Sequence, residues 1–193
     1  KSYKIAKLLQ LAKNLELLII DEAFCDCTPD QSIIPHLQTY NILVLRSLGK
    51  FFGLAGLRLG FVIGTIENIE PIKTRLGPWA VSGPAIEIGQ RALSDVAWIT
   101  QMHERLDLHS NRLNQVLLQK HLHIIGSTKL FKLVENKYAS EIYRILCESG
   151  ILVRQFEENK DWLRIGLPGP ENEWRRLDAA LDLCLNTVNN MSK

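Results

Sequence analysis

Short apolar runs alternate with polar stretches in the first third of the chain. Spaced apolar residues among lysines predict an amphipathic helix over residues 3–14. Continuous apolar runs at residues 15–20 and 41–45 predict strands that are apolar on both faces, which is typical of a parallel sheet covered by helices on each side. Residues 61–64 predict a third strand. These elements indicate a piece of an α/β layer.

Prolines and glycines then interrupt the pattern before a long helical stretch begins. The interruption is marked by Pro71, Gly77-Pro78 and Gly83-Pro84. Apolar residues at helical spacing continue to about Lys120, with a bend or break expected near Trp98. The remaining residues predict two strands, a helix, two more strands and a last helix, over residues 124–125, 130–134, 138–149, 151–153, 162–165 and from Pro170 onward.

The element order predicts an α/β fold in two parts. The first part, residues 1–105, is a partial large domain that includes the start of the long helix. The second, residues 106–193, is a small α+β domain. Gly150 is expected to end the helix before it in the left-handed conformation that glycine adopts most easily.

The composition is that of an ordinary globular protein. Apolar residues make up 46% of the 193 residues and charged residues 23%, which excludes a disordered chain. The net charge of +2 is too small for a nucleic-acid-binding protein, and no run of about 18 apolar residues predicts a membrane span. The four scattered cysteines favour reduced thiols in the cytoplasm. The chain starts with a lysine and not with Met, so we expect further sequence upstream.

Chemically active residue types gather where the predicted strands end, which is where ligands bind in open α/β sheets. Asp21 follows the first apolar run and Ser47 the second, and Lys50 lies in the glycine-rich segment that follows. Burial of a lysine in such a segment would lower its pKa and make it a nucleophile able to form a Schiff base. Ser47 and Arg58 can donate to a phosphate, and Asp21 can pair with a cationic ring nitrogen. Together these groups describe a site for pyridoxal phosphate.

Other ligand types fit the sequence less well. Cys25 and Cys27 form a lone Cys-x-Cys without a second pair, and His121 and His123 are a similarly weak pair, so no metal site is expected. The glycine-rich segment matches neither the dinucleotide fingerprint nor the phosphate-binding loop of nucleotide hydrolases.

Three segments carry a family resemblance: Asp21–Phe24, Ser47–Lys50 and Gly53–Arg58. They resemble the fold-type I pyridoxal phosphate enzymes, the class I/II aminotransferases and their relatives. Within them the chain is most similar to the threonine-phosphate decarboxylases of cobalamin biosynthesis and to the related histidinol-phosphate aminotransferases. The stretches that favour the decarboxylase branch are residues 46–52, 77–84 and 162–169. The resemblance implies the C-terminal part of the aminotransferase fold, with a mostly parallel sheet in a partial cofactor-binding domain.

The resemblance implies a role for each residue of the site. Lys50 would form the internal aldimine and move protons at the substrate Cα, and Asp21 would pair with the pyridinium nitrogen. Ser47 and Arg58 would bind the cofactor phosphate. Arg164, in the predicted small domain, matches the arginine that takes the substrate carboxylate.

Two residues depart from the family pattern, and one adds to it. Phe24 stands where many aminotransferases have a tyrosine that contacts the cofactor. Gly49 stands where histidinol-phosphate aminotransferases often have a serine for the phosphate. Arg154 is a candidate for binding the substrate phosphate.

The activity implied is decarboxylation of L-threonine O-3-phosphate to (R)-1-amino-2-propanol O-2-phosphate. One alternative is an aminotransferase of the histidinol-phosphate type; another is a catalytically incomplete fragment that lacks an N-terminal half. The expected partners are a phosphorylated amino acid substrate and a second copy of the chain in a homodimer, with no nucleic acid and no membrane.

Overall fold

A computed structural model describes residues 3–191, which form two compact units with the boundary between Trp98 and Ile99. Each unit has its own apolar core. The domain boundary expected at residues 105/106 stays a prediction. Among the described residues, no helix is both long enough and apolar enough to cross a membrane.

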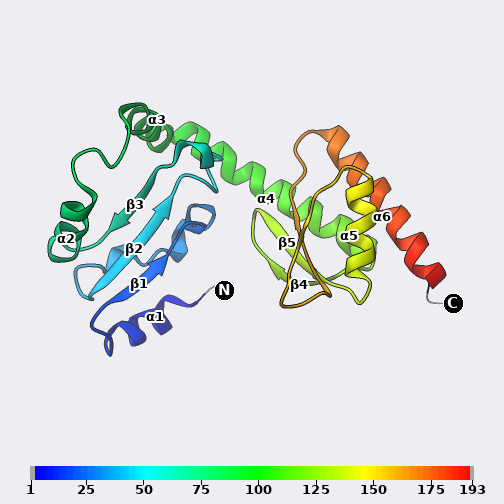
Figure 1. Cartoon of the computed structure of the whole chain (residues 1–193), viewed down its shortest axis with the longest axis horizontal. Helices are drawn as coiled ribbons and strands as arrows, with labels where there is room; N and C mark the ends of the chain where they lie inside the picture. Colours follow the sequence, from blue (N-terminus) through cyan, green and yellow to red (C-terminus); the bar gives the residue numbers. More distant parts are fainter. Residues whose placement is uncertain (1–2, 192–193) are drawn as a thin grey trace. The chain divides into compact units, whose positions relative to one another are not determined.

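Unit 1 is built on a three-stranded sheet with the strand order β1-β2-β3 (Figure 1). The strands are β1 (Leu18–Asp21), β2 (Ile42–Ser47) and β3 (Gly60–Ile63). β1 and β2 are parallel, as predicted, whereas β3 is antiparallel to β2. The sequence predicted a mostly parallel sheet and did not predict the direction of β3. The segment between β2 and β3 holds only the one-turn helix η4 (Ala55–Leu57) and lacks the helical crossover that a parallel return requires.

The two faces of this sheet differ in burial. One face packs Ile42 and Val44, both fully buried, against α1 (Ile5–Ala12) and the segment around the short helix η3 (Ile34–His36). The other face carries Ile19, Leu45 and Val62, of which Ile19 is 58% exposed. Leu43 on this second face is buried, so within the described chain this face is covered in part, which falls short of the expectation of helices on both sides.

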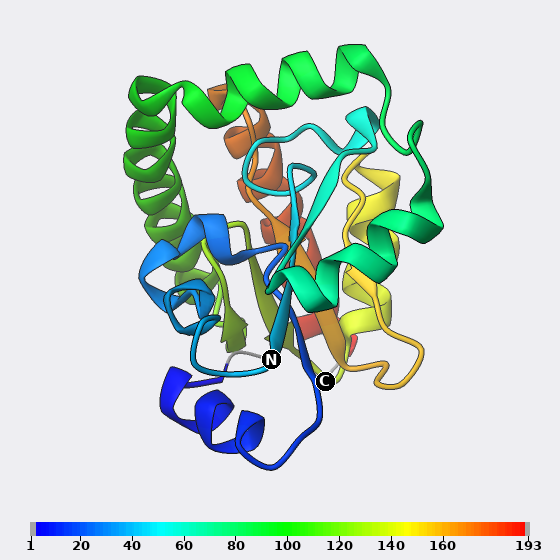
Figure 2. The same cartoon turned by 90° about the vertical axis from the view of Figure 1, so that its left-hand side faces the viewer.

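Three helices follow the sheet: α2 (Ile66–Leu76), α3 (Gly83–Ser94) and α4 (Val96–Gln119). The sequence predicted only a break around Pro71, which is wrong, because α2 contains that proline. None of the residues of α2 is buried, but Ile69, Ile72 and Leu76 recur at helical spacing, a signal that the proline and the glycines around it obscured. The helix breaks at Asp95, three residues before the predicted bend, so that α3 and α4 are separate helices (Figure 2). The Asp95 carboxylate caps α4 by accepting from the backbone N–H of Trp98 at 2.9 Å.

Unit 2 contains an antiparallel sheet with the order β4-β5-β7-β6. Its elements are β4 (His123–Ser127), β5 (Phe131–Glu135), α5 (Ala139–Glu148), β6 (Arg154–Gln155), β7 (Trp162–Gly166) and α6 (Glu171–Met191). Helices α5 and α6 lie side by side (Figure 1). Their buried faces join α4 and the sheet in one core that includes Leu113, Leu146, Leu163 and Leu181.

The turn after α5 explains the one misplaced strand in this unit. Gly150 adopts the predicted left-handed conformation with φ of 72°, and the N–H of Ile151 then donates to the carbonyl of Leu146 at 2.8 Å. Residues 151–153 are therefore used to close the helix end, and Val153 is buried in the core. The strand predicted over 151–153 instead forms at Arg154–Gln155.

A buried lysine connects the sheet of unit 2 to α4. Lys132 on β5 is only 4% exposed, and its Nζ donates to the Ser110 hydroxyl at 2.8 Å and to the Ser127 hydroxyl at 2.6 Å. Burial lowers the pKa of Lys132 from its ordinary value, because the charged form loses its hydration.

Candidate active site

The first two predicted site residues end the two parallel strands. Asp21 is the last residue of β1 and is paired in register with Leu45, and Ser47, the last residue of β2, lies two positions further along. Because side chains alternate between the faces of a strand, Asp21, Leu45 and Ser47 share one face. The Asp21 carboxylate accepts from the backbone N–H of Ala23 at 2.9 Å and is exposed. A carboxylate and a hydroxyl are thus presented on one face at the same end of the sheet.

The loop that follows β2 and contains Lys50 is held in place by buried apolar side chains. Leu48 and Phe51 are buried on either side of Lys50, and the Phe51 ring makes an edge contact with Trp98 at 5.7 Å between centroids. The Lys50 side chain itself is exposed. The desolvated surroundings predicted for this lysine are therefore not found in the described residues, which fix the backbone at this position and leave the amine open.

Lys50 and Phe24 bring the loops that follow β1 and β2 together. The Lys50 Nζ lies 5.3 Å from the centre of the Phe24 ring, a cation–π distance. Phe24 comes three residues after Asp21, so this contact places the amine beside the loop that begins at the aspartate. Phe24 occupies the position at which the family pattern has a tyrosine, and here its ring faces the lysine.

The predicted phosphate-binding residues, Ser47 and Arg58, are connected through contacts at Gly49 and Ala55. The N–H of Gly49 donates to the Ser47 hydroxyl at 3.1 Å. A Cβ at position 49 would lie 3.3 Å from both the Ala55 Cα and the Ser47 oxygen, so the absence of a side chain permits this close approach. Arg58 donates to the Ala55 carbonyl at 3.1 Å from a left-handed backbone position with φ of 54°. Ser47, Gly49 and Arg58 therefore all lie around Ala55.

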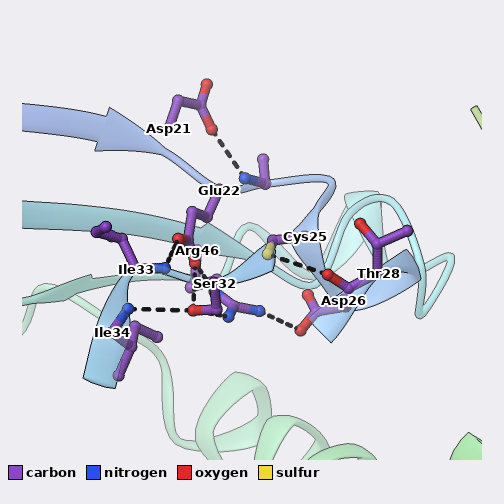
Figure 3. A network of polar contacts seen from close by, with 10 residues as sticks. Asp21, Glu22, Cys25, Asp26, Thr28, Ser32, Ile33, Ile34 and Arg46 are labelled. Atoms are coloured by element: carbon purple, nitrogen blue, oxygen red, sulfur yellow. Dashed lines mark hydrogen bonds and ion pairs between the residues drawn. The ribbon is translucent and has the colours of Figure 1, made fainter. Parts of the chain in front are cut away.

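A polar cluster that the sequence did not assign to the site lies on the other face of the same strand ends (Figure 3). It consists of Glu22, Asp26, Ser32 and Arg46. The Arg46 Nε donates to Glu22 at 3.0 Å, and one of its terminal nitrogens donates to Asp26 at 2.5 Å. The signal that could have revealed the cluster is a second acid, Glu22, two residues after one apolar run and an arginine directly after the next.

The cysteines next to this cluster have no metal-binding arrangement. Cys25 is half-buried and Cys27 is buried, and neither is in a disulfide. Burial, together with the nearby Glu22 charge, raises the pKa of Cys25 to about 11. In the described part of the chain no group of His, Cys, Asp and Glu side chains could hold a metal ion.

The two arginines of unit 2 that the sequence assigned to the substrate lie directly opposite each other. Arg154 on β6 pairs in register with Arg164 on β7. The Arg164 guanidinium lies over the Phe131 ring at 4.8 Å, and that of Arg154 lies over Phe156 at 5.4 Å. Within residues 3–191 neither arginine forms an ion pair with a carboxylate. Like charges on opposite positions of a sheet repel, so the pair favours an anion between them.

An open pocket adjoins this pair of arginines. Its volume is about 390 Å³, and its lining comprises Leu130, Phe131, Leu152, Val153, Arg154, Arg164 and Gly166. Leu152 is strongly exposed although it is apolar. The pocket thus combines two cationic groups with an apolar wall, as a binding site for a small organic anion would.

A family model for aminotransferase class I and II matches residues 2–181 of the chain. The chain belongs to this family. It is 43% identical over 164 residues to a threonine-phosphate decarboxylase of Pseudomonas aeruginosa, covering 85% of the chain and 49% of that protein. It is 33% identical over 174 residues to a histidinol-phosphate aminotransferase of Vibrio vulnificus, covering 86% of the chain and 49% of that protein. The chain spans about half the length of the curated relatives it matches.

Solved structures show the same fold. A histidinol-phosphate aminotransferase from Sinorhizobium meliloti, in complex with pyridoxal-5'-phosphate, matches 97% of this chain and 54% of its own, with a TM-score of 0.82 and 23% identity. An L-threonine-O-3-phosphate decarboxylase from Porphyromonas gingivalis matches 95% of this chain and 60% of its own, with a TM-score of 0.80 and 19% identity. These matches confirm the prediction of an α/β chain with part of the aminotransferase fold.

Membership of this family implies pyridoxal 5'-phosphate as the cofactor, and the residues of unit 1 fit that group. The donor set contains an acid for a ring nitrogen at Asp21 and an amine at Lys50. It also contains hydroxyl and guanidinium donors at Ser47 and Arg58 for a phosphate. A Cβ at Gly49 would lie only 3.3 Å from the Ser47 oxygen, so glycine suits the close packing beside this hydroxyl.

Proposed function

We propose that this chain carries the cofactor- and substrate-binding residues of a pyridoxal phosphate-dependent decarboxylase. The substrate would be L-threonine O-3-phosphate and the product (R)-1-amino-2-propanol O-2-phosphate, an intermediate in cobalamin biosynthesis. The identity of 41–43% to two threonine-phosphate decarboxylases supports this assignment over the more distant aminotransferases. The structural observation that carries it is the unpaired cross-strand couple of Arg154 and Arg164.

The residues of unit 1 would hold and tune the cofactor. When bound, pyridoxal phosphate supplies an electron sink for the charge that develops at the substrate Cα. Asp21 holds a proton at the ring nitrogen, and Ser47 and Arg58 bind the phosphate group. Lys50, placed beside Phe24, holds or moves a proton at the substrate Cα.

The residues of unit 2 would bind the substrate through its two anionic groups. Phosphothreonine carries a carboxylate and a phosphate, and the two opposed guanidinium groups offer a fork to each. Arg164 would take the carboxylate, since the Phe131 ring beneath it restricts the plane of its fork. Arg154 would take the phosphate.

The pair of arginines suits phosphothreonine because this one substrate engages both guanidinium groups at once. An aminotransferase would use them in separate half-reactions, one for the phosphate of histidinol phosphate and the other for the carboxylate of the 2-oxo acid acceptor. Gly49 also favours the decarboxylase, because the serine that histidinol-phosphate aminotransferases often have here would place its Cβ 3.3 Å from two neighbouring atoms. We further propose that the enzyme works as a cytoplasmic homodimer.

The test is an assay of the purified protein with phosphothreonine and pyridoxal phosphate, with no 2-oxo acid present. Release of carbon dioxide that is lost in Lys50→Ala supports the decarboxylase. A keto product that appears only when a 2-oxo acid acceptor is added would assign the aminotransferase instead. A well-folded protein that stays colourless with the cofactor would support the third reading, a catalytically incomplete fragment.

A further inference from the structure

We propose that the cluster of Glu22, Asp26, Ser32 and Arg46 is a positioning device that fixes Asp21 and Ser47 for the cofactor. The proposal rests on the proposed function, because it concerns the two side chains at the strand ends that would contact the ring nitrogen and the phosphate. None of the four cluster residues would touch the cofactor itself.

The topology ties each member of the central ion pair to one site residue. Glu22 directly follows Asp21, and Arg46 directly precedes Ser47. Because successive side chains of a strand point to opposite faces, the pair lies on one face and the two site residues on the other. Figure 3 shows the Asp21 carboxylate pointing away from the cluster, which lies on the far side of the strand ends.

The cluster satisfies both members of the buried pair from several segments of the chain. Glu22 is 6% exposed, and its carboxylate accepts from Arg46 at 3.0 Å, from the Ser32 hydroxyl at 2.8 Å and from the N–H of Ile33 at 2.7 Å. Arg46 in turn donates to Glu22, to Asp26 at 2.5 Å and to Ser32 at 3.1 Å. A fork bonded in three directions has little freedom to rotate or shift.

These side-chain bonds join the ends of β1 and β2 beyond their last paired residues, Asp21 and Leu45. The backbone N–H of Glu22 donates to the carbonyl of Leu45 at 2.8 Å, which is one residue beyond β1. The Glu22–Arg46 bond then connects the chain just beyond β1 to the end of β2. Since a residue cannot shift without its neighbour, the spacing of Asp21 and Ser47 follows the spacing of this ion pair. Ordering the two side chains before the cofactor arrives would raise its affinity by preorganisation.

The test compares Glu22→Gln with a matched control, Glu87→Gln, which removes a carboxylate from an exposed ion pair with Arg91 in the same unit. Two quantities are measured: the dissociation constant for pyridoxal phosphate, and amide hydrogen exchange of the cofactor-free chain. For Glu22→Gln we expect the dissociation constant to rise about ten- to hundredfold, the effect of losing a charged hydrogen bond. Exchange should accelerate at residues 20–24 and 46–50 and stay unchanged over residues 83–94. The control should leave both quantities within about twofold.

A second variant keeps the test decisive if Glu22→Gln does not fold. Arg46→Lys retains a cation for Glu22 and loses the fork that reaches Asp26 and Ser32, so it should show the same local exchange pattern with a smaller loss of affinity. If hydrogen exchange accelerates evenly through unit 1, the cluster only stabilises the unit as a whole, and the positioning role is overturned. A folded variant with unchanged affinity would also overturn it. An unsubstituted chain with no affinity for pyridoxal phosphate would overturn the proposed function itself.

Discussion

Replacing the buried Lys132 with methionine should stabilise unit 2. Lys132 is 4% exposed, and its ammonium has two serine hydroxyls as acceptors and no carboxylate partner among the described residues. Burial of an ion costs several kcal/mol, and two charge-assisted bonds recover about 1.5–3 kcal/mol each. Methionine fills a similar volume without a charge, so we expect a net gain of about 1 kcal/mol. In a unit of this size that gain corresponds to a melting temperature about 4–8 °C higher.

The same burial predicts how stability depends on pH. The pKa of Lys132 is lowered in the folded chain, whereas the unfolded chain keeps the ordinary value of 10.5. Between these two pKa values the unfolded state binds more protons, so stability rises with pH in that window. Below the folded-state pKa the charge is present in both states and its burial cost is constant. The rise should be present in the unsubstituted chain and absent in Lys132→Met.

Urea denaturation followed by circular dichroism measures both effects. Lys160→Met is the control, because Lys160 is exposed and its loss should change stability by less than about 0.5 kcal/mol. A Lys132→Met variant that is less stable than the unsubstituted chain at pH 7 would refute the reasoning. It would mean that the bonds to Ser110 and Ser127 outweigh the loss of hydration.

Three further outcomes are expected. Arg164→Lys should raise the KM for phosphothreonine about tenfold or more, because lysine cannot offer a bidentate fork, and an unchanged KM would remove Arg164 from the substrate site. Gly53→Ala should lower stability by about 1 kcal/mol, since Gly53 has φ of 68° with open space around it, and denaturation midpoints equal to the parent would contradict this. Cys25 should resist alkylation by iodoacetamide at pH 8 because its pKa of about 11 keeps the thiol protonated; mass spectrometry of the labelled chain would show an adduct if the pKa were lower.

The sequence predicted the parts of the fold that depend on local pattern. The apolar runs around Ile20 and Val44 were found as strands, and Gly150 ended its helix in the expected conformation. Asp21 and Ser47 could be placed at one end of a sheet because parallel strands bring their carboxyl ends together. Their roles toward a cofactor stay predictions.

The contacts that the sequence did not reveal depend on partners that are distant along the chain. The direction of β3 depends on what the chain between the strands can span. The bond between Glu22 and Arg46 joins residues 24 positions apart, and only the register of the strands makes them neighbours. In the same way, the opposition of Arg154 and Arg164 follows from a strand that forms three residues later than the hydrophobic pattern indicates.

At Arg58, which has a left-handed backbone conformation, the stability of the fold and the proposed binding of the cofactor phosphate favour different residues. A side chain other than glycine at φ of 54° and ψ of 37° costs about 1 kcal/mol. Glycine at position 58 would relieve this strain and remove the guanidinium in the same substitution. Selection for thermal stability alone would therefore remove the group proposed to bind the cofactor phosphate. The selected chain would be more stable and would bind pyridoxal phosphate with lower affinity.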